Sequence, residues 1–222
     1  TEMAGQSSYQ ALERCVADLK NGKVDVLVTG PINKHNIQSG EFNFPGHTEY
    51  LQKSFESEEV LMLMVSESMK VGTVTGHLPL SKVSEAITTE KILTKLRLLN
   101  KSLIQDFGIR KPRIAILGLN PHAGDNGLLG SEEIEIIIPA IETARKEGIV
   151  ALGPYAADGL FGTSFVKKFD AVLAMYHDQG MIPFKSLAFG EGVNFTAGLP
   201  IVRTSPDHGT AFDIAGKDKA DA

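Results

Sequence analysis

The sequence predicts an α/β fold in which parallel strands are covered by helices on both faces. Short apolar runs rich in Val, Ile and Leu alternate with segments of helical periodicity, as in sheets that are buried on both sides. Apolar residues make up 42% of the 222-residue chain, which is enough to bury a sizeable core. We expect two lobes with a cleft between them, one formed by residues 45–185 and the other by residues 1–44 with 186–222.

Six apolar runs predict strands. Each is short and dominated by aliphatic or β-branched residues, which is typical of buried strands. They cover residues 24–30, 60–66, 70–77, 113–119, 170–176 and 194–202.

Three helices are predicted between these runs, at residues 7–21, 88–107 and 131–147. In the second, Ile92 and Leu96 begin a series of apolar residues at helical spacing.

The third helix has an acidic start and an internal proline. Glu132, Glu133 and Glu135 lie in its first turns, where negative charge favours the helix dipole. Pro139 lies inside the helical pattern, so we predict a kink or an early break there.

Charge and cysteine content exclude several classes of protein. The net charge of −5 argues against a general nucleic-acid binder. Cys15 is the only cysteine, so no intramolecular disulfide forms, which fits a reducing cytoplasm. No apolar run approaches the ~20 residues that span a bilayer, and we expect no membrane partner. The chain starts at Thr1 without a Met, and both ends read as parts of a longer protein.

Three histidines follow apolar runs at similar points. His77 ends VGTVTGH, His122 ends IAILGLNPH and His177 ends AVLAMYH. A single histidine of this kind is more often a hydrogen-bonded structural residue. Three at the ends of parallel strands emerge at one sheet edge, and imidazoles without cysteine predict a catalytic divalent-metal site. Asp158 and Asp178 either orient the imidazole rings or act as turn and cap residues.

Two glycine-rich segments each have two interpretations. NPHAGDNGLLGSEE, residues 120–133, either brings backbone N–H groups to a phosphate or is a flexible turn. It lacks the Walker lysine and the Rossmann glycine spacing. RTSPDHGTAFDIAGK, residues 203–217, either wraps a nucleotide or is a capped connection that begins a short helix.

Cationic and polar residues elsewhere are also ambiguous. Lys34 lies among turn residues after the first strand, and Lys185 and Arg203 flank Asn194. Cations near an amide bind anions, although each of these residues alone reads as a solvated surface charge.

Seven stretches occur in a fixed order: VTGPINK, PGHTEYL, HLPL, LGLNPHAG, MYHDQG, GVNFTAGLPIVRTS and DHGTAFDIAGK. Each is a weak signal alone, but together they cover nearly the whole chain. The ordered set resembles the signature blocks of the 4-hydroxythreonine-4-phosphate dehydrogenases of pyridoxal phosphate biosynthesis. The resemblance implies a two-lobed α/β/α fold similar to isocitrate and isopropylmalate dehydrogenases. Family members have a preceding segment and a longer carboxyl-terminal helix, so it also implies a chain incomplete at both ends.

The resemblance also implies roles for individual residues. The metal ligands are His77, His122 and His177, and the metal is Zn, Mg, Mn or Co. The substrate contacts are His47, Thr48, Lys185, Asn194 and Arg203, with Lys185 and Arg203 on the phosphate. The residues against the NAD cofactor are His208, Gly209 and Thr210. The general base is left open between Asp158 and Lys185.

The implied reaction is the NAD-dependent oxidation and decarboxylation of 4-phosphohydroxy-L-threonine to 3-amino-2-oxopropyl phosphate. The implied assembly is a cytoplasmic homodimer with a shared metal site, in which His77 comes from one subunit and His122 with His177 from the other. Three alternatives stay open: a dehydrogenase of phosphorylated threonate, a phosphate acyltransferase of related fold and a three-histidine metal hydrolase.

Overall fold

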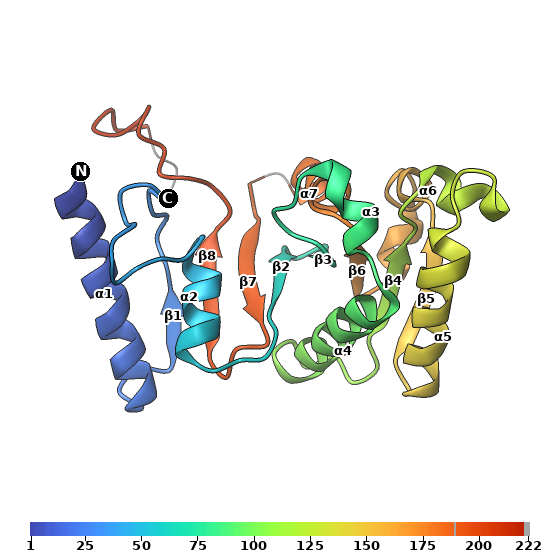
Figure 1. Ribbon diagram of the computed structural model, residues 1–222, viewed down its shortest axis with the longest axis horizontal. Helices are drawn as coiled ribbons and strands as arrows, with labels where there is room; N and C mark the ends of the chain where they lie inside the picture. Colours follow the sequence, from blue (N-terminus) through green and yellow to red (C-terminus); the bar gives the residue numbers. More distant parts are fainter. Residues whose placement is uncertain (189, 220–222) are drawn as a thin grey trace. The chain divides into compact units, whose positions relative to one another are not determined.

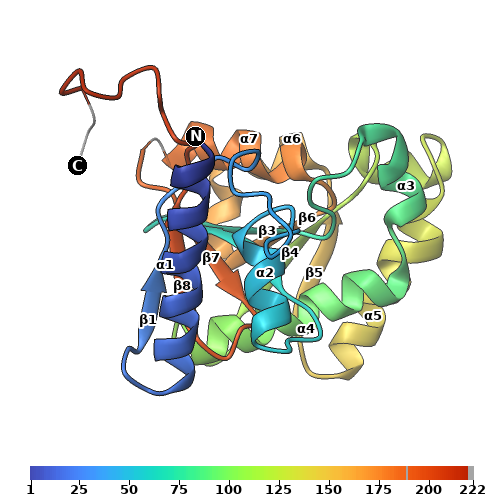
Figure 2. The same cartoon turned by 60° about the vertical axis from the view of Figure 1, so that its left-hand side comes forward.

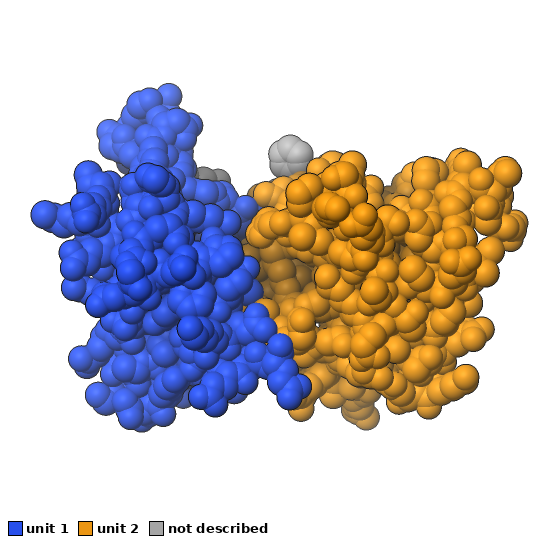
Figure 3. Space-filling view, in the orientation of Figure 1, with its two compact units in different colours: residues 1–58, 199–222 blue, residues 59–198 orange. Residues whose placement is uncertain are grey.

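The computed structural model describes residues 1–188 and 190–219, which form a mixed α/β fold (Figure 1). The chain divides into two compact units, coloured separately in Figure 3. Unit 1 contains residues 1–58 and 199–222, and unit 2 contains residues 59–198. The chain therefore passes between units at 58/59 and 198/199, whereas the expected lobes were bounded at 44/45 and 185/186. No helix in the described ranges is long and apolar enough to cross a membrane.

Unit 1 consists of a short parallel pair of strands and two helices. Strand β1 (Val26–Val28) pairs with β8 (Val202–Pro206). Helix α1 (Glu2–Lys20) lies along this pair (Figures 1 and 2) and α2 (His47–Ser54) follows a long loop. The core of the unit combines aliphatic residues of α1 with buried aromatic rings, among them Tyr9 and Phe42.

Unit 2 contains a six-stranded sheet in the order β7-β2-β3-β6-β4-β5. Strands β3, β6, β4 and β5 are parallel, whereas β2 is antiparallel to both of its neighbours. The strands are β2 (Leu61–Val65), β3 (Lys70–Thr73), β4 (Arg113–Leu117), β5 (Val150–Tyr155), β6 (Ala171–Ala174) and β7 (Val193–Ala197).

Helices and turns connect these strands. The helices are α3 (Val83–Ala86), α4 (Thr89–Gln105), α5 (Ile138–Lys146), α6 (Ala157–Phe161) and α7 (His177–Ala188). Shorter segments are η1 (Leu80–Lys82), η2 (Pro121–Gly127), the π-helical turn η3 (Glu133–Ile137) and η4 (Ser164–Lys168).

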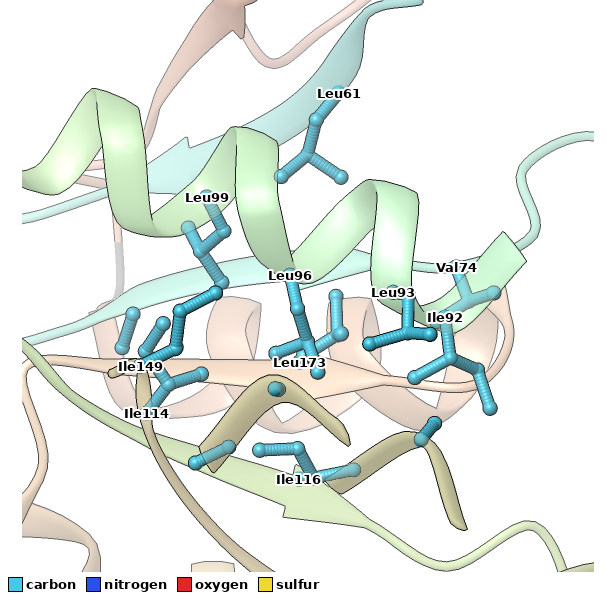
Figure 4. Close-up of a cluster of buried hydrophobic side chains, with 14 of the residues drawn as sticks. Leu61, Val74, Ile92, Leu93, Leu96, Leu99, Ile114, Ile116, Ile149 and Leu173 are labelled. Atoms are coloured by element: carbon cyan, nitrogen blue, oxygen red, sulfur yellow. The ribbon is translucent and has the colours of Figure 1, made fainter. Parts of the chain in front are cut away.

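The sheet of unit 2 is buried on both faces because its side chains alternate between two cores. Ile114 and Ile116 of β4 face a cluster with α4 and α5, whereas Ala115 and Leu117 face a second cluster with α6 and α7. In Figure 4, leucines of α4, among them Leu96, point onto the first face. Alternation with apolar residues on both faces explains why these strands read as continuous apolar runs.

Five of the six predicted strands are present, but the run at 194–202 is not one strand. It forms β7 and β8, which belong to different units, with a turn between them. Gly198 has φ +93° and Pro200 lacks an amide hydrogen, so the run cannot continue as one ladder.

Strand direction, an additional strand and the third helix also bear on the sequence predictions. The expectation of an all-parallel sheet was wrong at β2, and β5 was not predicted. The break expected near Pro139 is confirmed, because the third helix starts as a π-helical turn and continues as α5 from Ile138. The short helix expected within 203–217 is absent, and the part of that segment after β8 forms turns.

A substitution at Leu96 tests the packing of the core of unit 2. It lies on α4 with no exposed surface, whereas Ile104 on the same helix is 42% exposed. Leu96→Ala removes buried contacts and leaves a cavity, so it should lower the free energy of unfolding by about 2–5 kcal/mol. Chemical denaturation measures this loss, and Ile104→Ala is the control on the same helix. Equal losses for both variants would contradict the burial of Leu96.

Candidate active site

Three neighbouring parallel strands place histidines beyond one edge of the sheet. β3 pairs with β6, and β6 pairs with β4. The β3–β6 ladder continues past the strands, because Thr75 donates its N–H to the carbonyl of Met175 over 3.1 Å. His77 and His177 each lie two residues beyond this last pair. Pairing in register therefore brings both rings to the same edge.

Side-chain hydrogen bonds tie the three strand ends together. The hydroxyl of Thr75 donates to the Met175 carbonyl over 2.8 Å. The Gln179 amide accepts the Met175 N–H over 2.7 Å and donates to the Gly118 carbonyl over 2.7 Å. One side chain thus joins the end of β6 to the end of β4, and the edge that carries the histidines is fixed by polar contacts.

His77 and His177 form a pair of imidazoles that fits a metal. Their ring centroids are 5.8 Å apart with planes inclined by 37°. Two imidazoles on one tetrahedral zinc, with Zn–N distances of about 2.0–2.1 Å, have ring centroids roughly 5 Å apart. Asp178 Oδ1 lies 2.8 Å from His177 Nδ1, which leaves Nε2 of that ring for a ligand. The donor set and its spacing fit a divalent cation.

His122 lies in a different setting, at a cavity of about 480 Å³. The cavity is bounded by the loop after β4, by α6 with Asp158, and by α7 with Asp178 and Gln179. Apolar walls come from Phe161, Ile182 and neighbouring residues. This is a concave, mostly apolar space with a few polar groups, as in small-molecule sites.

The three histidines do not converge within one chain. Among the described residues, no group of three or more His, Cys, Asp or Glu side chains is arranged to hold a metal. His77 lies beside His177 in this chain. The convergence of the three histidines on one metal, and the subunit from which each comes, stay predictions.

The loop that carries His122 has an unusual backbone. Residues His122 to Gly127 all have positive φ, between 42° and 94°. Non-glycine residues adopt this left-handed region at a cost of about 1–2 kcal/mol each. The segment therefore forms a left-handed turn.

Unit 1 contains a separate group of cationic and polar residues. Arg203 on β8 is only 3% exposed and donates through Nη2 to the Thr29 hydroxyl over 2.7 Å. Burial lowers the pKa of Arg203 to about 10, with Glu49 opposing the shift. The guanidinium therefore stays charged at neutral pH.

His47 is the first residue of α2, and its pKa is influenced by Arg203 and Lys34. Burial lowers its pKa to about 4, and the positive charges of Arg203 and Lys34 add to this effect. Gly46 caps α2 without a side-chain hydrogen bond. The amino end of α2, with His47 and Thr48, thus offers N–H groups beside positive charge, an arrangement that attracts anions.

Two predicted substrate contacts lie in unit 2. Asn194 is on β7, half-buried, and its Oδ1 has no hydrogen-bond partner among the described residues. Lys185 lies exposed in the last turn of α7. An unsatisfied amide oxygen suits a ligand that donates a hydrogen bond.

The residues predicted against NAD lie after β8. His208 and Gly209 are exposed, Thr210 is half-exposed, and His208 Nδ1 lies 2.8 Å from the Gly209 carbonyl oxygen. A Cβ added at Gly209 would meet no atom within 4 Å. These residues alone therefore form no cradle for a dinucleotide, and their cofactor role stays a prediction.

Sequence reasoning missed two residues that organise the site. Gln179 lies inside the MYHDQG block, but nothing in the sequence shows that its amide reaches Gly118. Glu133 was interpreted as an acid in a first helical turn, whereas it is buried, 2% exposed, in the π-helical turn. Its position on the apolar face of the predicted helix, in register with Ile137, was the available signal.

The pKa of His47 predicts a pH dependence. The neutral ring in the folded state and a pKa of about 6.5 in the unfolded chain mean that the unfolded chain binds more protons between about pH 6.5 and 4. Stability from this group is therefore present above pH 6.5 and falls as the pH drops toward 4.

His47→Gln should reduce this loss, as measured by urea denaturation at several pH values. His35→Gln, at an exposed site of the same unit, is the control. NMR titration of the His47 ring should give a midpoint near 4. A midpoint at or above 6.5 would disprove the proposed environment.

Two known proteins match nearly the whole chain. A 4-hydroxythreonine-4-phosphate dehydrogenase from Bacteroides thetaiotaomicron is 55% identical over 215 residues, which are 96% of this chain and 59% of the relative. The crystal structure of a 4-hydroxythreonine-4-phosphate dehydrogenase from Klebsiella pneumoniae matches with a TM-score of 0.89 and 40% identity, over 100% of this chain and 66% of that one.

A more distant structure shares the fold. A terephthalate 1,2-cis-dihydrodiol dehydrogenase from Burkholderia xenovorans matches with a TM-score of 0.73 and 28% identity, over all of this chain and 70% of that one. This chain spans about three fifths of the Bacteroides relative.

The family model of the pyridoxal phosphate biosynthetic protein PdxA matches residues 1–222, the full length of the sequence. The blocks that carry the histidines of the sheet edge lie within this match. The chain belongs to the PdxA family.

Proposed function

We propose that this protein oxidises and decarboxylates 4-phosphohydroxy-L-threonine with NAD, in pyridoxal phosphate biosynthesis. The observation that carries the proposal is the imidazole pair of His77 and His177 at the sheet edge, within a chain that matches the PdxA family throughout. The substrate loses two electrons at its secondary alcohol, and the resulting β-keto acid loses CO2 to give 3-amino-2-oxopropyl phosphate.

The metal would be held by His77 and His177 of one chain and His122 of another. Asp178 orients His177 for this role through the contact at Nδ1. A divalent cation here would supply Lewis-acid polarisation of the reacting oxygens. Zinc is one choice for an imidazole donor set, and Mg, Mn and Co are the others proposed.

The substrate phosphate is assigned to Arg203 and Lys185. Arg203 is buried and charged, and a buried cation is most stable when paired with an anion. The amino end of α2, with His47 and Thr48, adds backbone N–H groups. Because His47 is neutral, it can accept or donate a hydrogen bond without adding charge.

The remaining polar residues orient the substrate and accept its proton. The free Oδ1 of Asn194 would accept a hydrogen bond from the substrate amine. Asp158 lines the cavity that His122 borders, which favours it over Lys185 as the base that takes the hydroxyl proton. A carboxylate placed at the cavity wall needs no further activation for this transfer if the hydroxyl is already polarised.

The role assigned to NAD is to accept the hydride. The residues proposed to contact it are His208, Gly209 and Thr210. Because these three residues alone form no cradle, further residues would be needed to hold the dinucleotide.

A homodimer is proposed as the working unit. Apolar side chains are exposed on two segments of unit 2, with Leu80 at 72% and Leu128 at 79%. Ser84 donates to Glu132 over 2.7 Å, so the two segments lie together. The full set, termed the apolar patch, is Leu78, Leu80, Leu128, Leu129, Ile134 and Ile138. Exposed apolar residues on neighbouring segments are typical of a protein interface. The set begins at Leu78, next to His77, so a second chain bound there would lie near the proposed metal ligands.

The direct test is an assay of the full-length protein with 4-phosphohydroxy-L-threonine, NAD and a divalent cation. NADH and CO2 should form in equal amounts. Phosphorylated threonate is the second arm, because the Burkholderia relative shows that this fold serves dehydrogenases of other substrates. NADH from phosphorylated threonate alone would assign the sister reaction. Metal-independent acyl transfer or hydrolysis without NADH would replace the proposal.

Removal of the Arg203 charge should weaken substrate binding. Loss of a buried charged partner costs about 2–5 kcal/mol, so Arg203→Met should raise KM for the phosphorylated substrate more than tenfold. Steady-state kinetics measure this change. Arg110→Met, at an exposed position, is the control, and an unchanged KM in Arg203→Met would place the phosphate elsewhere.

Subunit mixing tests the shared metal site. His77→Ala and His122→Ala should each be inactive, because each homodimer lacks one ligand in both sites. In a mixed dimer one site collects both defects and the other is intact. Activity should therefore return after subunits exchange.

Native mass spectrometry verifies the exchange, and two copies of His77→Ala carrying different mass labels are the control. A mixture that exchanges but stays inactive would mean that His77 and His122 of one site come from the same chain, which contradicts the proposed division of the ligands.

A further inference from the structure

The π-helical turn after the His122 loop buries a carboxylate where a helix would bury an apolar side chain. Glu133 is 2% exposed and lies in register with the buried Ile137, whereas Ile134 and Ile138 point outward with 50% and 36% exposure. A buried carboxylate is costly unless it is hydrogen-bonded. Its partners therefore indicate what the residue does.

The hydrogen bonds that the structure gives to the Glu133 carboxylate all come from the segment that leads into the His122 loop. Oε1 accepts the backbone N–H groups of Leu119 and Asn120, each over 2.7 Å. Oε2 accepts the Asn120 side-chain amide over 3.0 Å. The carboxylate thus holds the entry to the left-handed turn by three bonds, two of them to backbone.

The loop packs directly on the same carboxylate. A Cβ at Gly124 would lie 2.6 Å from Glu133 Oε2, and a Cβ at Gly118 would lie 3.0 Å from Oε1. Both positions carry glycine, so the backbone can approach the carboxylate closely. Gly127, at the end of the turn, makes no such approach, since a Cβ there would meet Ile134 at 3.3 Å.

We propose that Glu133 is a positioning residue that fixes the left-handed turn at residues 120–127 and so directs His122 toward its ligand. Left-handed dihedrals at His122, Ala123, Asp125 and Asn126 persist only where surrounding contacts impose them. The three hydrogen bonds to Glu133 supply that constraint. The claim that the turn directs His122 toward a metal rests on the proposed function. The claim that Glu133 fixes the turn does not.

Glu133→Gln tests the constraint with little change of shape. Its amide places an NH2 group against either two backbone N–H donors or the Asn120 amide, and a donor facing a donor cannot bond. Hydrogen exchange of residues 119–130, measured by mass spectrometry on the full-length protein, should be at least tenfold faster than in the unsubstituted protein. Glu142→Gln, on the exposed face of α5, should leave this exchange unchanged.

A second pair of variants tests the same contact from the loop and covers the case in which Glu133→Gln fails to fold. Gly124→Ala and Gly127→Ala both place alanine at positive φ, +80° and +94°, so they share the backbone cost. Only Gly124→Ala pushes on the carboxylate. Exchange in 119–130 should rise more in Gly124→Ala than in Gly127→Ala, and equal rates would overturn the proposal.

Co²⁺ titration, followed by its visible absorption, provides the readout at the metal. Loss of an outer residue that orients a ligand typically weakens metal binding 10–100-fold, so Glu133→Gln should bind Co²⁺ at least tenfold more weakly than Glu142→Gln. If the unsubstituted protein binds no Co²⁺, the metal function fails and exchange alone decides the role of Glu133. Unchanged exchange, or faster exchange with unchanged Co²⁺ affinity, would overturn the proposal.

Discussion

The in-register pairing of β3, β6 and β4 is the constraint on which the candidate site depends. The last backbone hydrogen bond between β3 and β6 joins Thr75 to Met175. His77 and His177 each lie two residues further along the chain, so the parallel pairing places their rings side by side. Backbone pairing alone would leave the carboxyl ends of these strands weakly connected, so side-chain hydrogen bonds are also needed. Thr75 and Gln179 provide them by bonding the carbonyl and the N–H of Met175 and the carbonyl of Gly118 at the strand ends. The polar residues that close the ladder are therefore also those that fix the histidines.

Unit 1 buries a positively charged side chain, Arg203. Arg203 is buried in a β-strand, where burial lowers its pKa and Glu49 opposes the shift, and its positive charge helps to lower the pKa of His47. Desolvation of a cation is costly, and the lowered pKa values of Arg203 and His47 express that cost. An arrangement that keeps positive charge buried is expensive for stability alone, which is why an anionic ligand is the natural counterpart. The buried charge is consistent with the phosphate-binding role proposed for Arg203.

The sequence predicts the elements of the fold better than their connections. Apolar runs indicate strands because both faces of the sheet are buried, but such runs carry no sign of direction, so the antiparallel β2 could not be foreseen. Gly198 and Pro200 inside the run 194–202 were the local signal that it divides. The histidines were predictable because each ends a strand. Gln179 and Glu133 were not, because their partners are backbone groups up to 61 residues away, and backbone groups leave no pattern in a sequence.

The π-helical turn η3 explains why one short segment serves two purposes. Glu133 and Ile137 are four residues apart and share one face of a helix, so the buried face would be expected to carry an apolar side chain at position 133. Here Glu133 turns inward to the His122 loop, and Ile134 faces solvent in the apolar patch. The cost of burying a carboxylate is offset by three hydrogen bonds, and the cost of exposing isoleucine is removed if a second chain covers it. The register that places Glu133 against the His122 loop also exposes Ile134 in the apolar patch. Under the proposed function, one turn of helix would therefore couple the position of His122 to the surface that a second chain covers.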